Sequence, residues 1–191
     1  MTGENAVGAE DVVIEVREAE INNQRVFWDH YHQINNDNYL FADLEGQWNG
    51  PFCFVQAADT QFGMIESYLE KKENPGWDKE VALTRKAIRA ANEMQPRPKF
   101  FVVCGDLLDA FPDEKPDMRE EQEHDFKTVF SQLSSEIPLV CVCGNHDIGN
   151  TPSRQTVSAY RSSFGDDFFS FWVGGVFFIV LNSQYYWDSS E

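Results

Sequence analysis

The sequence lacks an apolar run long enough to cross a membrane. Its longest apolar stretch, from Phe168 to Leu181, is interrupted by Gly174 and Gly175 and is shorter than a transmembrane helix requires. The first residues contain neither the basic segment nor the apolar segment of a secretory signal peptide. We therefore expect a cytoplasmic protein that does not act on a membrane.

Positive charge is also scarce. The 191 residues include 15 lysines and arginines against 32 aspartates and glutamates, which gives a formal net charge of −17. Nucleic acids and anionic lipid surfaces are recognised through positive charge, so we expect neither as a partner. A chain this acidic can bind a phosphate group only if cations are held inside the site, which is a first indication of bound metal.

Cysteine is too rare to form a disulfide framework. The four cysteines are Cys53, Cys104, Cys141 and Cys143, and each lies in an apolar segment rather than in a loop. We therefore predict that they are reduced residues of the core. Only one residue separates Cys141 from Cys143, whereas zinc-binding pairs are usually separated by about two to four residues, so a zinc site there is not expected.

The residue pattern changes near residue 51. Residues 1–50 are rich in acids and show no clear hydrophobic period, so they are predicted to form an acidic N-terminal arm that is partly disordered. Residues 51–191 alternate apolar runs with helical patterns. We interpret them as one globular domain.

Three apolar runs of strand length are separated by two amphipathic helical patterns. The runs cover 52–58, 99–104 and 139–143, and the helical patterns cover about 78–94 and 119–134. Apolar strands that alternate with helices are typical of a buried parallel sheet, so the predicted class is α/β. A short helix over 156–164 and a hairpin around Gly174-Gly175 complete the predicted elements.

Polar residues stand at the end of each apolar run. Asp59 follows the first run, Gly105-Asp106 the second and Gly144-Asn145-His146-Asp147 the third. Each segment alone is an ordinary turn, but the carboxyl ends of parallel strands meet where α/β proteins bind ligands. Carboxylates suit hard divalent cations, and imidazole suits zinc, iron and manganese. The segments therefore predict a metal site, in which Asp106 is placed to bridge two cations.

These segments resemble the metal-binding blocks of the calcineurin-like metallophosphoesterase superfamily. The superfamily pattern runs D-x-[HQ], GD-x-x-[DH], GNH[DE], a later lone histidine and GHxH. The chain shows, in the same order, Asp59-Thr60-Gln61, Gly105-Asp106-Leu107-Leu108-Asp109 and Gly144-Asn145-His146-Asp147. The resemblance implies a four-layer α/β/β/α sandwich and a centre of two divalent metal ions (Mn, Fe, Zn or Mg).

The resemblance also implies the metal ligands. Asp59 and Gln61 would bind the first metal. Asp106 would bridge the two metals, and Asn145 would bind the second.

Two further residues are implied as catalytic. His146 would stabilise or protonate the leaving alkoxide, and Asp147 would orient and charge His146. Asp109 has a parallel in the wider pattern and is interpreted as structural.

The chain departs from the superfamily pattern after its third block. No histidine follows His146, so the lone histidine and the GHxH block are missing. We therefore expect a C-terminally truncated sandwich, in which residues 51–191 form the N-terminal half of a metallophosphoesterase domain. His30 and His32, in the N-terminal arm, are left as an alternative ligand pair.

The expected function follows from the resemblance. It is metal-dependent phosphoester hydrolysis, as in a protein serine/threonine phosphatase that acts on a phosphorylated protein. Two alternatives stay open: a phosphodiesterase or nucleotide pyrophosphatase of the same superfamily, and a non-catalytic truncated form. We also expect the hairpin from Phe168 to Leu181 to expose apolar side chains.

Overall fold

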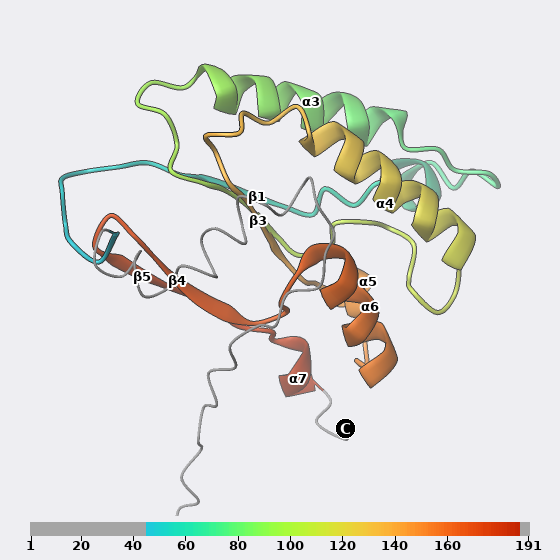
Figure 1. The fold of residues 1–191 in the computed structure, drawn as a ribbon. Helices are drawn as coiled ribbons and strands as arrows, with labels where there is room; N and C mark the ends of the chain where they lie inside the picture. Colours follow the sequence, from blue (N-terminus) through green and yellow to red (C-terminus); the bar gives the residue numbers. More distant parts are fainter. Residues whose placement is uncertain (1–44, 188–191) are drawn as a thin grey trace, which may run out of the picture.

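The computed structural model describes residues 45–187. Most of the predicted N-terminal arm, including His30 and His32, lies outside the described residues. The helices and strands of these residues are labelled β1 to α7 along the chain, and Figure 1 shows how they are arranged.

A three-stranded parallel sheet forms the centre of the fold. Its strands are β1 (Val55–Ala58), β2 (Phe101–Cys104) and β3 (Leu139–Val142), in the spatial order β1-β2-β3. The register pairs Val55 with Phe101 and Phe101 with Leu139, so the three strands end side by side at the same edge. The parallel sheet and its connecting helices confirm the predicted α/β class.

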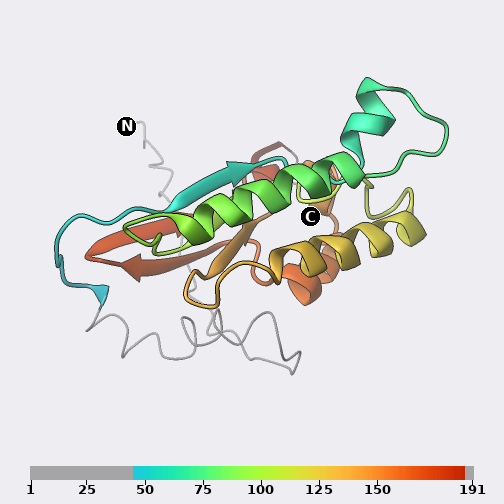
Figure 2. The same ribbon diagram turned by 90° about the horizontal axis from the view of Figure 1, so that it is seen from above.

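Two helices cover one face of this sheet (Figures 1 and 2). The helix α3 (Asp78–Glu93) connects β1 to β2, and α4 (Pro116–Phe130) connects β2 to β3. Each buries residues at helical spacing, such as Thr84, Ile88 and Ala91 in α3. The α4 helix begins earlier than the predicted start at 119, because proline is well accommodated in the first turn of a helix.

The hairpin packs on the opposite face of the sheet. Its strands are β4 (Phe169–Val173) and β5 (Val176–Val180), joined at Gly174 and Gly175 with φ values of 56° and 81°. Two successive positive φ angles match the tight turn predicted for a two-residue hairpin loop. Buried Phe171 meets Phe100 of the central sheet edge-on, with ring centroids 5.4 Å apart. Helices, sheet and hairpin thus form three successive layers in the described part of the chain.

Glu45 fastens the start of the described chain to the hairpin turn. The backbone N–H of Gly174 donates to Glu45 Oε2 at 2.7 Å, and that of Gly175 donates to the Glu45 carbonyl at 2.6 Å. The outer face of the hairpin exposes Trp172, Phe177 and Ile179, as expected from the sequence.

Four short helical elements complete the fold of residues 45–187. A π-helix, η1 (Ile65–Leu69), lies near the N-terminal end of α3 (Figure 2). The helices α5 (Asn145–Ile148) and α6 (Arg154–Phe164) follow β3. The last helix, α7 (Gln184–Trp187), was not among the predicted elements, since its four residues are too few to show a helical period.

The cysteines are free, as predicted, and Cys141 and Cys143 are buried. Burial raises the pKa of Cys143 to about 12, so its thiol is unreactive at neutral pH. Across residues 45–187, the helices are too short or too polar to cross a membrane.

Candidate active site

Three of the four candidate ligands stand on strained backbone in the loops that follow β1 and β2. Asp59, Gln61 and Asp106 have φ values of 52°, 38° and 48°, in the left-handed region that side chains other than glycine rarely adopt. Such conformations persist where the surrounding structure enforces them, and they concentrate at functional sites.

Hydrogen bonds between two loops enforce these conformations. The N–H of Asp59 donates to the Gly105 carbonyl at 3.1 Å, and that of Gln61 donates to the Asp106 carbonyl at 2.9 Å. The Thr60 hydroxyl donates to the Leu107 carbonyl at 3.0 Å. The loops that follow β1 and β2 are therefore held side by side.

The two carboxylates held in these loops influence each other. Partial burial, followed by repulsion from Asp106, raises the pKa of Asp59, while His146 acts in the opposite direction. Two like charges that are held close together favour a cation between them. The electrostatics of this edge therefore agree with the predicted metal site.

Asp106 also contacts the loop that follows β3. Its Oδ1 accepts a hydrogen bond from the His146 N–H at 3.0 Å. A Cβ placed on Gly144 would lie only 2.2 Å from the same oxygen. The glycine of this block is therefore required for the close approach of the two loops, and Asp106 lies between the first and third segments as predicted.

Asn145 is the first residue of α5, between Gly144 and His146. Its amide nitrogen donates to Asn150 Oδ1 at 3.0 Å. The amide nitrogen of Asn145 is therefore used in a hydrogen bond within the protein, and its Oδ1 is the atom that could bind a metal.

The His146 ring is held on three sides. Its Nδ1 donates to the Asp109 carbonyl at 2.6 Å, and its Nε2 lies 3.2 Å from Gln61 Nε2, whose amide can donate to it. The ring also packs against Phe111, with ring centroids 4.1 Å apart. These contacts favour the neutral tautomer that carries its proton on Nδ1 and direct Nε2 toward the candidate ligand Gln61.

The predicted partner of His146 is wrong. The Asp147 carboxylate is buried and accepts hydrogen bonds from the N–H groups of Leu107 (3.1 Å and 3.2 Å) and Gly144 (2.8 Å), rather than from the imidazole. Burial raises the pKa of Asp147 to about 7, against the opposing effect of its backbone hydrogen bonds and of Arg119. Asp147 therefore joins the loops that follow β2 and β3, because its side chain points from a short helix back toward the strand ends.

Asp109, rather than Asp147, is the acidic residue that contacts the His146 ring. Besides the carbonyl contact, its Oδ1 lies 4.0 Å from His146 Nδ1, and its Oδ2 accepts a hydrogen bond from the Ser67 hydroxyl at 2.8 Å. The sequence alone favours a structural role for Asp109. The available signal was its place as the last residue of the second block, three residues after Asp106.

The residues present fit part of a metal centre for hard cations. Asp59 and Asp106 supply carboxylate oxygens, and Gln61 and Asn145 can supply amide oxygens. Within residues 45–187, however, His, Cys, Asp and Glu side chains do not form a group of three or more able to hold a metal ion. The structure thus brings the predicted ligands to one edge of the sheet, where they form an oxygen-rich but incomplete coordination shell.

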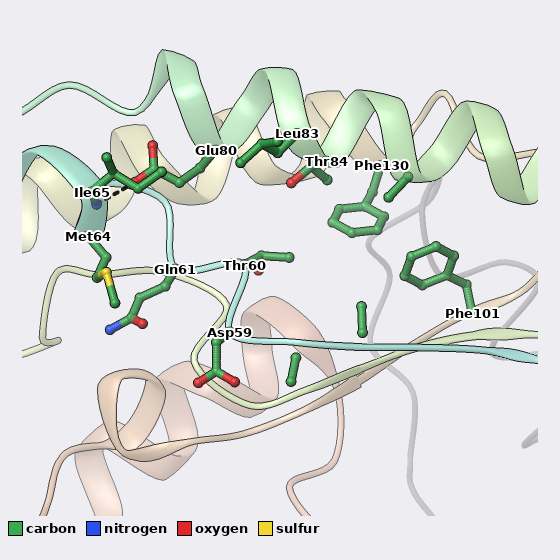
Figure 3. Close-up of a pocket in the computed structure, with 13 residues that line it drawn as sticks. Asp59, Thr60, Gln61, Met64, Ile65, Glu80, Leu83, Thr84, Phe101 and Phe130 are labelled. Atoms are coloured by element: carbon green, nitrogen blue, oxygen red, sulfur yellow. Dashed lines mark hydrogen bonds between the residues drawn. The ribbon is translucent and has the colours of Figure 1, made fainter. Parts of the chain in front are cut away.

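A cavity of about 270 Å³ lies beside two of these ligands (Figure 3). Asp59 and Gln61 line it together with residues of η1 and α3, including Ile65, Leu83 and Glu80. The Glu80 side chain is buried, and its Oε1 accepts a hydrogen bond from the Ile65 N–H at 2.7 Å. Glu80 therefore fixes the start of η1 against α3 at the wall of this cavity.

Comparison with known proteins matches residues 53–189 to the family described as calcineurin-like phosphoesterase. The chain is also similar to proteins named serine/threonine-protein phosphatase CPPED1. It is 47% identical to that of Mus musculus and 50% identical to that of Homo sapiens, in each case over 153 residues, 78% of this chain and 48% of the relative. Identity to that of Danio rerio is 47% over 154 residues. The chain spans about half the length of these relatives.

Proposed function

The chain belongs to the calcineurin-like phosphoesterase family, and from this premise we propose that it carries part of the active site of a metal-dependent protein serine/threonine phosphatase. The observation that carries the proposal is the convergence of Asp59, Gln61, Asp106 and Asn145 beside His146 at one sheet edge. The substrate class, a phosphorylated serine or threonine side chain of a protein, is supported by the names of the relatives.

The proposed metal centre holds two divalent ions. Asp59 and Gln61 would bind the first ion, Asn145 the second, and Asp106 both. When bound, such a pair of ions neutralises the phosphate oxygens and activates a water molecule. The candidate ligands are oxygens, which favour Mg²⁺ or Mn²⁺ over softer ions. Asp59 and Asp106 would also supply the negative charge that retains cations in the site.

His146 would move the proton in this reaction. The Asp109 carbonyl accepts from Nδ1 and so fixes the ring, which leaves Nε2 as the atom that would first take up a proton from solvent and then pass it to the leaving serine or threonine oxygen. Phe111 covers the ring and limits its contact with water.

A second candidate function is a non-catalytic form. It is favoured by the absence of a group of three or more His, Cys, Asp and Glu ligands from the described part of the chain. A domain half that binds metal weakly could still bind phosphorylated proteins without hydrolysing them. The cytoplasm is the proposed location of either form, supported by the four free cysteines.

Metal content and hydrolysis, measured together, test the proposal. A version of the protein extended to the length of its relatives is purified without metal, loaded with Mn²⁺ or Mg²⁺, and assayed by elemental analysis and by phosphate release from phosphoserine and phosphothreonine peptides. A phosphodiester and a nucleoside diphosphate serve as competing substrates. Metal-dependent release from phosphopeptides that Asp106→Asn abolishes is the expected result. Preferred hydrolysis of the diester or diphosphate would indicate one of the sister activities, and metal-free phosphopeptide binding would indicate the non-catalytic form.

A further inference from the structure

We propose that Arg119 is a positioning residue, which holds the His146 backbone in the place that proton transfer requires; this role rests on the proposed function. Arg119 lies in the first turn of α4, outside the three metal-binding blocks. Its guanidinium nevertheless reaches the loops of the second and third blocks.

The guanidinium donates to three backbone carbonyls. Nη1 donates to the carbonyls of Ala110 at 2.7 Å and His146 at 3.0 Å, and Nη2 donates to that of Asp147 at 3.0 Å. Ala110 directly follows Asp109, whose carbonyl accepts from His146 Nδ1. Arg119 therefore joins the same two chain segments that the Nδ1 contact joins, so the position of the imidazole is set from both its ring and its backbone.

An ion pair does not account for these contacts. Among the described residues, Arg119 has no carboxylate at ion-pair distance, and the Asp147 carboxylate is occupied by the N–H groups of Leu107 and Gly144. Burial lowers the pKa of the Arg119 guanidinium, an effect that nearby acids including Asp147 partly oppose. The Arg119 guanidinium is partly buried, and its three hydrogen bonds all go to backbone carbonyls. Its role is therefore to hold the backbone in place.

The arginine side chain is suited to this role and lysine is not. A planar guanidinium presents several donors in fixed directions and can reach three acceptors at once, whereas an ammonium is a single point on a flexible chain. The base of Arg119 is also fixed, because its N–H donates to the Lys115 carbonyl at 2.9 Å in the first turn of α4. The Arg119 side chain thus fixes the position of the His146 backbone relative to helix α4.

The first test reads the His146 ring in the 191-residue chain without any assay of activity. The chain is labelled with ¹⁵N, and the tautomer of His146 is determined by NMR in the parent, Arg119→Met, Arg119→Lys and Arg85→Met, with His146→Gln to assign the signals. Arg85 is exposed on α3 and is the matched control for loss of one charge. The parent and the control are expected to carry the proton on Nδ1. Both Arg119 variants are expected to show a mixture of the two tautomers. If Arg119→Met does not fold, the comparison is made with Arg119→Lys only.

The second test reads turnover in a version of the protein extended to the length of its relatives. Arg119→Lys is expected to lower kcat by roughly tenfold to a hundredfold, the scale for a displaced catalytic group, while KM and metal content stay near the parent values. An unchanged tautomer in both Arg119 variants, or an unchanged kcat, would overturn the proposal. If the parent hydrolyses no phosphoester, the proposed function fails, and the NMR result still decides whether Arg119 positions His146.

Discussion

Asp106 makes the contacts expected of a bridging ligand at the residue scale. It lies on left-handed backbone, its carbonyl accepts from Gln61, and its Oδ1 accepts from the His146 N–H. One residue therefore contacts both neighbouring blocks, the first through its backbone carbonyl and the third through its carboxylate. A residue in such a position determines the geometry of the whole site, because a displacement of Asp106 moves both its neighbours.

In a version of the protein extended to the length of its relatives, replacement of Asp106 by asparagine is expected to remove most of the bound metal and most of the turnover. The substitution keeps the size of the side chain but removes the negative charge that two cations would share. Elemental analysis and phosphate release measure both effects in the same sample. Asp113→Asn, at an exposed loop position, is the control with the same loss of charge. Normal metal content and normal turnover in Asp106→Asn would show that Asp106 is not a bridging ligand.

His146→Ala is expected to separate proton transfer from metal binding. Loss of a general acid lowers turnover by roughly a hundredfold or more. Metal content is expected to stay near that of the parent, since the imidazole contacts Gln61, Asp109 and Phe111 rather than serving as a proposed ligand. His124→Ala, at an exposed position on α4, is the control. Loss of a metal equivalent on removal of His146 would assign this side chain to the metal instead.

At the element scale, the three strands of the sheet and the location of the site in the loops after them could be predicted from the sequence. The apolar runs identified β1, β2 and β3, and the polar residues after them identified the site edge. The partner of His146 could not be predicted, because the contact with Asp109 joins residues 37 apart in the chain and depends on how two loops cross. The role of Asp147 was missed for the same reason, since its acceptor oxygens face backbone 40 residues away.

A second element-scale feature is the buried Asp167, which joins two helices that follow the site and the loop before the second of them. Its Oδ1 accepts from Arg161 Nε of α6 at 2.5 Å, and its Oδ2 accepts from Asn182 at 2.9 Å and from Tyr185 of α7 at 2.8 Å. Burial, together with this contact, raises the pKa of Tyr185 to about 12, so the hydroxyl remains a donor at neutral pH. The short helix α7 is therefore held in place by side chains rather than by its own length.

Asp167→Asn is expected to lower the free energy of unfolding by about 1–3 kcal/mol, because three donors, among them the buried Asn182, lose a charged and fully buried acceptor. Urea denaturation measures the change, and hydrogen exchange over residues 182–187 is expected to accelerate. Asp113→Asn again serves as the exposed control. Equal stability and equal exchange in parent and variant would mean that α7 is held by other contacts.

The two faces of the hairpin differ sharply at the scale of the whole molecule. Its inner face buries Phe171 against the sheet, whereas Ile179, Phe177 and Trp172 on its outer face are 63%, 47% and 39% exposed. A group of large apolar side chains on a two-stranded sheet favours association with another surface.

The chain is therefore expected to self-associate as its concentration rises, and Ile179→Lys is expected to reduce this association. Sedimentation velocity across a range of concentrations measures the effect. Tyr68→Lys, at an exposed aromatic residue of η1, is the matched control and should leave association unchanged. A chain that stays monomeric at every concentration would show that the outer face of the hairpin does not associate.

The contact between Glu45 and the hairpin turn has a consequence for the order of assembly. The side-chain hydrogen bond from Gly174 to Glu45 spans 129 residues of sequence. During synthesis, Glu45 leaves the ribosome long before its partner exists, and closing so long a loop is entropically costly. Residues 45–50 are therefore expected to acquire their final position only after the hairpin has formed, so the earliest described part of the chain is secured late in assembly.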